Sequence, residues 1–89
     1  MTRGPVTVAN EAGLHARAAV EFVSLACRFR SRIRLRRDSM EVNGKSILGL
    51  LQLGAARGTR LQLIVEGEDE VEAFAALRRM IEGGPDAAG

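Results

Sequence analysis

The chain has 89 residues and a net charge of +2, which predicts one domain near the lower size limit for folding without metals or disulfides. Apolar residues make up 46% of the sequence but aromatic residues only 3%, so the core must be largely aliphatic. A single cysteine and a single histidine exclude an internal disulfide and a zinc site made of those ligands, and no apolar run approaches the ~20 residues of a membrane span.

The first predicted elements are a strand and a helix. Val6–Val8 is a short β-branched run after Pro5, which predicts a strand. Residues 10–13 predict a turn. From residue 16 to about residue 29, apolar residues recur at the 3.6-residue spacing of a helix with one buried face. That face comprises Ala19, Val20, Phe22, Val23, Ala26, Cys27 and Phe29.

Two further strands are expected after this helix. Residues 31–37 alternate arginine with aliphatic residues, which is typical of a strand with one buried face. Residues 39–42 are expected to pair with it after a turn, with Met40 and Val42 on the inner face.

A short helix and a fourth strand come next. Ser46 is a natural N-cap for a helix over residues 47–53, which Gly54 would end. Residues 59–66 alternate aliphatic and polar side chains, apart from Ile64, and predict a strand.

The last predicted element is a helix. Asp69 followed by Glu72 resembles a capping box and predicts where it begins. Gly83–Pro85 predicts where it ends, and we expect residues 84–89 to form a flexible tail. The side chains expected to point inward are Val71, Phe74, Leu77, Met80 and Ile81.

The resulting order, β-α-β-β-α-β-α, predicts a single domain over residues 1–89. Because the strands have one polar and one apolar face, we expect a four-stranded, mainly antiparallel sheet with three helices on one face. This is an α+β, open-faced β-sandwich. The N-terminus lacks the apolar core of a signal peptide, so we expect a cytoplasmic protein without membrane insertion.

His15, the only histidine, lies where the turn opens the first helix, two residues before Arg17. The free N–H groups and the dipole of a helix N-terminus attract an anion, and a guanidinium can chelate its oxygens. A neutral imidazole here is suited to hold a phosphoryl group. No acid–base pair or metal-ligand constellation accompanies it, so we expect a phosphoryl carrier and not a stand-alone enzyme.

Two motifs in the chain occur together in one known family. Gly13–Arg17 reads Gly-Leu-His-Ala-Arg, and Val42–Leu51 reads Val-Asn-Gly-Lys-Ser-Ile-Leu-Gly-Leu-Leu. In this order they closely resemble HPr, the histidine-containing phosphocarrier family of the bacterial sugar phosphotransferase system. The resemblance runs from about Pro5 to Ile81, without an evident insertion.

The resemblance implies a phosphorylation site and partners. His15 would carry phosphate on Nδ1, Arg17 would stabilise the phosphoryl group, and the backbone of Ala16 and Arg17 would contact it. The donor would be phosphorylated enzyme I, and the acceptors would be enzyme IIA domains, with no cofactor and no metal in the carrier itself. We expect a monomer, because such a carrier docks successive partners with one surface.

The resemblance also implies roles for the short helix. Ser46 would be the regulatory serine modified by an HPr kinase/phosphorylase, and Ile47, Leu48 and Leu51 would form an apolar docking patch. The alternatives are that Ser46 is only an N-cap and that the apolar cluster belongs to the core. A helix of about two turns cannot bury every apolar position, so part of the cluster should be exposed, which marks an interaction site.

One position departs from the family pattern. The motif normally reads His-x-Arg-Pro, and here Ala18 takes the place of the proline. Alanine is an excellent helix former, so the helix should persist. The substitution makes an alternative function plausible: a regulatory HPr paralogue whose phosphorylation at His15 or Ser46 gates binding to a regulator or enzyme, without sugar transport.

A third function class, nucleic-acid binding, would use the arginine-bearing face of residues 32–36. Sheet-surface RNA readers need aromatic residues for base stacking, and this strand has none, so we expect no nucleic-acid partner. Arginines are concentrated in residues 28–37 and acidic residues in residues 66–72. Such a separation of charges can steer a charged partner.

Overall fold

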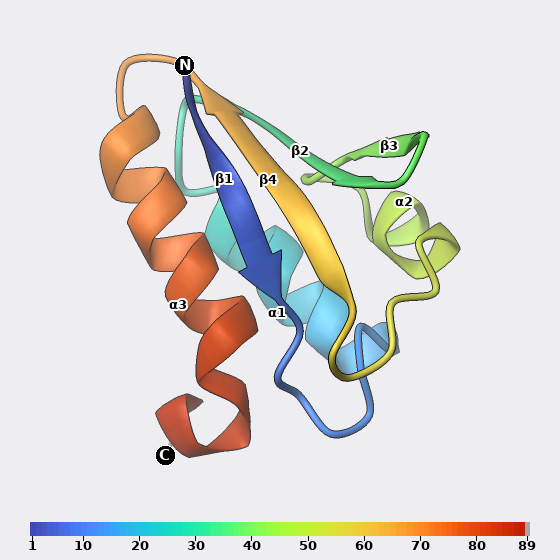
Figure 1. Ribbon diagram of the computed structural model, residues 1–89. Helices are drawn as coiled ribbons and strands as arrows, with labels where there is room; N and C mark the ends of the chain where they lie inside the picture. The colour runs from blue at the N-terminus through green and yellow to red at the C-terminus, as the bar shows by residue number, and fades with distance from the viewer. Residues whose placement is uncertain (89) are drawn as a thin grey trace.

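The computed structural model describes residues 1–88 and shows a four-stranded sheet with three helices packed on one side of it (Figure 1). The predicted α+β open-faced sandwich and the order of its elements are confirmed. No helix in this range is long and apolar enough to span a membrane. The elements are β1 (Thr2–Thr7), α1 (Ala16–Ala26), β2 (Arg32–Arg37), β3 (Met40–Asn43), α2 (Ile47–Gln52), β4 (Arg60–Glu66) and α3 (Glu70–Ala88).

The sheet has the strand order β1-β4-β2-β3, and each neighbouring pair is antiparallel. Strand β1 is longer than predicted, since it begins at Thr2 and includes Gly4 and Pro5. Its pairing with β4, from Thr2 opposite Val65 to Thr7 opposite Arg60, holds these residues in the sheet. Pro5 is tolerated because β1 is an edge strand.

The core lies between the sheet and the helices and is aliphatic, as predicted, with Phe22 as its largest member. The buried stripe of α1 is narrower than the sequence indicates. Val20 is 47% exposed and Cys27 is also exposed. Both lie outside the line formed by Ala19, Phe22 and Ala26.

Two other side chains expected to point inward are exposed. Val71 is 70% exposed because, at 100° per residue, it lies about 200° around α3 from the buried Ala73. Met40 is 47% exposed at the start of the edge strand β3. On that strand Val42 is half-buried, and it lies close beneath Gly49 of α2.

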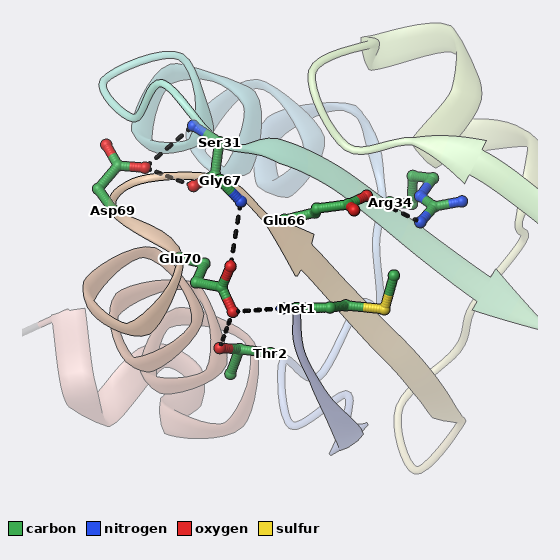
Figure 2. A network of polar contacts seen from close by, with 8 residues as sticks. All are labelled: Met1, Thr2, Ser31, Arg34, Glu66, Gly67, Asp69 and Glu70. Carbon is green, nitrogen blue, oxygen red and sulfur yellow. Dashed lines mark hydrogen bonds and ion pairs between the residues drawn. The ribbon is translucent and has the colours of Figure 1, made fainter.

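The predicted capping box at the start of α3 is wrong. Asp69 instead accepts hydrogen bonds from the backbone N–H of Ser31 (3.0 Å) and from the Ser31 hydroxyl (Figure 2). It also accepts from the Arg30 N–H (2.8 Å), so it holds the segment that leads into β2. The Ser31 hydroxyl, followed by the Arg30 N–H, lowers the pKa of this carboxyl. The residue that reaches back is Glu70, whose Oε1 accepts from the Gly67 N–H at 3.2 Å.

The end of α3 also differs from the prediction, because the helix passes through Gly83–Pro85 and ends at Ala88. Pro85 has no N–H, so it cannot bond the carbonyl of Ile81 four residues earlier. That carbonyl accepts from the N–H of Ala9 at 3.1 Å, in the loop after β1. Gly89, the last residue of the expected tail, lies outside the described residues, and the flexibility of the tail remains a prediction.

Candidate functional site

The loop that leads to His15 is held by backbone hydrogen bonds to the segment before β4. The Val8 N–H donates to Thr59 O (2.9 Å), and the Gly58 N–H donates to Val8 O (2.7 Å). Further along, the Leu14 N–H donates to Ala55 O (2.8 Å). These bonds fix the path of the chain on both sides of the loop, so the residue that follows Leu14 has a defined position.

Gly13 permits the close approach at the tip of this loop. Its φ is +73°, a left-handed conformation that L side chains rarely adopt. A Cβ here would overlap Ala55 O and would lie 2.9 Å from Ala56 Cα. Only glycine fits this position without a shift of the backbone.

His15 is the N-cap of α1. Its backbone is extended (φ −79°, ψ −179°), and its carbonyl accepts the first helical hydrogen bond, from the Ala19 N–H at 2.9 Å. Its Nδ1 accepts a hydrogen bond from the Arg17 N–H at 3.2 Å. This contact requires a lone pair on Nδ1, which places the proton of a neutral imidazole on Nε2. In this tautomer Nδ1 is the ring nitrogen that carries the lone pair, and it lies at the N-terminus of α1.

The Arg17 guanidinium does not contact His15. Its Nε lies 3.6 Å from Glu21 Oε1, one turn along α1, and the Arg17 side chain is 85% exposed. Exposed ion pairs of this kind contribute little free energy, so the guanidinium is free to turn toward an anion at His15. Ala16 is exposed as well and puts no bulk between His15 and solvent.

A cavity of about 360 Å³ lies beside His15, and nothing in the sequence indicates it. Its apolar lining comes from α1, through Ala18 and Phe22, and from α3, through Met80 and Ile81. His15 and Arg17 also line it. The cavity depends on the packing of two helices far apart in the sequence, although the small side chain at Ala18 is a local contribution to it.

Ser46 caps α2 as predicted: its Oγ accepts from the Gly49 N–H at 3.0 Å. The next residues divide into a buried and an exposed set. Leu50 and Leu53 are buried and anchor the helix. The α2 patch is defined by the three exposed apolar side chains, Ile47 (39% exposed), Leu48 (73%) and Leu51 (37%).

Val20 is a further exposed apolar side chain. It lies on α1, the helix that packs against α2. The periodicity of α1 predicts a buried Val20, so sequence reasoning missed this residue. Its position one residue after the buried Ala19 would have placed it at the edge of a narrower stripe.

Comparison with known proteins gives a consistent result. A family described as the PTS HPr component phosphorylation site matches residues 2–83. The phosphocarrier protein HPr of Treponema pallidum is 48% identical over 77 residues, which are 86% of this chain and 88% of that protein. The HPr-like protein Crh of Bacillus subtilis is 43% identical over 82 residues, covering 92% and 96% of the two chains.

The fold agrees with solved structures as well. A crystal structure of HPr-C-His from Thermoanaerobacter tengcongensis matches with a TM-score of 0.89 and 42% identity. The match covers 93% of each chain.

Proposed function

This chain belongs to the HPr family of the phosphotransferase system, and from that premise we propose that it accepts a phosphoryl group on His15 Nδ1. The donor would be phosphorylated enzyme I and the acceptors enzyme IIA domains. The observation that carries the proposal is the N-cap geometry, in which an unprotonated Nδ1 stands at the exposed start of a helix and faces the Arg17 N–H.

The geometry supports a transfer that needs no general base. The lone pair of Nδ1 attacks phosphorus while the donor's bond to phosphorus breaks, and the donor atom keeps that electron pair. Nδ1 carries no proton to remove, so the step requires no carboxylate beside His15. The reverse sequence, with His15 as the leaving group, delivers the phosphoryl group to the acceptor.

The same site supplies donors for the phosphoryl oxygens. When Nδ1 turns its lone pair toward phosphorus, it releases the Arg17 N–H, which then points at the incoming anion together with the Ala16 N–H. The Arg17 guanidinium exchanges its exposed contact with Glu21 for the stronger charge-assisted bonds to phosphate. The partner must supply the remaining stabilisation, since the site is open to solvent.

We assign partner docking to the α2 patch, which three exposed aliphatic side chains support. Phosphorylation of Ser46 by an HPr kinase/phosphorylase would place about −2 charge at the start of α2, beside this patch. The charge would be tolerated at a helix N-terminus, so the helix would persist while docking weakened. A monomer fits this use of one surface for successive partners.

A regulatory function is the second candidate, and the similarity to Crh proteins favours it, at 43–45% identity over 92% of this chain. In that case phosphorylation at His15 or Ser46 would gate binding to a regulator or an enzyme, and no enzyme IIA domain would accept the phosphate.

The test is incubation with enzyme I, Mg²⁺ and phosphoenolpyruvate, followed by intact mass and acid lability. We expect an acid-labile gain of one phosphate that His15→Ala abolishes. Addition of enzyme IIA domains should then remove it. If phosphate is gained and no enzyme IIA domain accepts it, the regulatory function replaces the carrier function. If a folded chain gains none, both His15-based functions fail.

Docking is tested with a matched pair of variants. Leu48→Ala and Val71→Ala remove side chains of nearly equal exposure, 73% and 70%, from α2 and from the start of α3. Leu48→Ala should raise the KM for the carrier by about fivefold to tenfold and leave kcat nearly unchanged, as expected for loss of binding alone. Val71→Ala should change neither. Equal effects of the two substitutions would remove the α2 patch from the docking surface.

A further inference from the structure

The sheet has a second face, turned away from the helices and from His15, and it is rich in arginine. The side chains that alternate with the core residues of each strand lie on it, and we call it the open face. From β1 to β3 it carries Arg3, Pro5, Arg60, Gln62, Ile64, Glu66, Arg32, Arg34, Arg36, Glu41 and Asn43. The strands thus place five arginines and only two carboxylates on the open face.

The centre of the open face is packed and neutralised. Ile64 is only 5% exposed although no helix covers it, and its register neighbours on either side are Arg3 and Arg34. Long aliphatic stems of arginine side chains cover apolar neighbours in this way. The Arg34 guanidinium lies 3.2 Å from Glu41 and 3.9 Å from Glu66, the second contact being drawn in Figure 2. This pairing leaves the excess positive charge toward the two ends of the face.

A shallow basic hollow lies at each end. One, of about 480 Å³, is lined by Arg3, Arg36 and Arg60 around Gln62, and Asp38 is its single acidic residue. The other, of about 570 Å³, is lined by Arg30, Arg32, Lys45 and Glu66, and the Arg30 guanidinium also lies 3.6 Å from Glu68. Arg32 and Arg36 are four residues apart on β2, so the hollows are separated by about 13 Å along the strand.

We propose that the open face binds an extended, acidic segment of a partner protein, with carboxylates in both hollows. In an extended chain, residues four apart on one side are also about 13 Å from each other, which matches the separation of the hollows. Guanidinium groups pair with carboxylates through two parallel hydrogen bonds. Because His15 lies on the helical side, this segment and a phosphoryl-transfer partner can bind at the same time.

The composition of the face favours a protein over other polyanions. Glu41 and Glu66 lie among the arginines and would repel a continuous line of phosphates, whereas separate carboxylates can avoid them. The strand residues named above include no aromatic side chain on which a base could stack. They also include no exposed large aliphatic side chain to enter a membrane surface, since Ile64 is buried.

The test titrates the ¹⁵N-labelled chain with a peptide of about twelve residues that alternates Glu and Thr, in low salt so that exposed charges are weakly screened. A peptide with Gln in place of Glu is the control. We expect saturable chemical-shift changes at Arg32, Arg36 and Gln62 with the acidic peptide only. His15→Ala should bind it equally well, which separates this result from the outcome of the phosphorylation test.

Variants locate the binding. The double substitution Arg36→Gln/Arg60→Gln should raise the Kd of the acidic peptide by about fivefold, which is the effect of losing two exposed charge pairs. Arg78→Gln/Arg79→Gln, with the same charge change on α3, should not. The proposal is overturned if both pairs weaken binding equally, or if the shifts cluster near His15 or Leu48. It is overturned too if a single-stranded oligonucleotide or phosphatidylglycerol vesicles bind this face more tightly than the peptide.

Discussion

Gly13→Ala tests how the loop positions His15. Gly13 has a φ of +73°, and an alanine in this conformation costs about 1–2 kcal/mol. Its Cβ would also overlap Ala55 O and approach Ala56 Cα to 2.9 Å, and such overlap adds about 1–3 kcal/mol. We therefore expect the free energy of unfolding to fall by about 2–5 kcal/mol, out of roughly 5–10 kcal/mol for a domain of this size.

Gly58→Ala is the matched control. Gly58 also has a left-handed backbone, with a φ of +89°, but none of the described atoms outside its chain neighbours lies within 4 Å of the Cβ position. It should cost only the conformational part, about 1–2 kcal/mol. Urea unfolding of the parent and both variants gives the two losses, and the initial rate of His15 phosphorylation reports the position of the imidazole.

The expected result is a larger loss of stability for Gly13→Ala than for Gly58→Ala, with slower phosphorylation of the folded fraction only in Gly13→Ala. Relief of the overlap requires the segment at Ala55 to move, and the Leu14 N–H donates to that same carbonyl. Equal losses in the two variants would refute the claim that close approach at Ala55 sets the loop path. Slow phosphorylation in both variants would instead indicate that strain at either glycine disturbs His15, whether or not the Cβ approaches Ala55.

Two further predictions concern the helix caps and a carboxylate. Ser46→Ala should lower the free energy of unfolding by about 1 kcal/mol, because the Gly49 N–H loses its acceptor, and should leave phosphoryl transfer unchanged. Ser46→Asp should retain the cap and slow transfer through the added charge; transfer rates equal to those of the parent would contradict this. Asp69→Asn should lower the Tm at neutral pH, since the Ser31 hydroxyl holds the pKa of this carboxyl below its usual 3.8. Because folding lowers that pKa, the ionised carboxyl stabilises the fold above pH 3.8, and this stabilisation is lost as the pH falls through the pKa of the folded state. The difference in Tm between the parent and Asp69→Asn should therefore shrink at low pH. A difference in Tm that does not change with pH would contradict this prediction.

The sequence predicts well wherever a local pattern determines the structure. The alternation of β2 and β4 and the N-cap at Ser46 depend on side chains within a few positions of each other, and these features are confirmed. The start of β1 is different, because Gly4 and Pro5 have low strand propensity and are held in the sheet by pairing with β4.

The errors at both ends of α3 have a common cause in long-range contacts. Asp69 matches a capping residue by spacing, but its partner Ser31 is 38 positions away. Gly83–Pro85 matches a helix end, but the Ile81 carbonyl that Pro85 cannot satisfy finds its donor in Ala9. In both cases the local pattern was present in the sequence, but a contact with a residue far away in the chain led to a different structure.

The departure at Ala18 bears on what holds His15 in place. Ala18 is the third residue of α1, in the first turn, where N–H groups have no helical acceptor. Among the described residues none accepts from the Ala18 N–H, since the helical bonds begin with Ala19 and His15. A proline would therefore remove no hydrogen bond, and the 360 Å³ cavity lined by Ala18 and Phe22 offers space for its ring.

Ala18→Pro should thus raise the free energy of unfolding by about 0.4–1 kcal/mol, by restricting the unfolded chain. The rate of His15 phosphorylation should stay within about twofold, because the backbone bonds of the preceding loop already fix the residue. Urea unfolding and the initial transfer rate, measured on the same preparation, check both statements. A loss of stability would show that the ring does not fit the cavity. A several-fold faster transfer would show that the loop bonds alone do not position the imidazole, and that a proline at this position contributes to catalysis through His15.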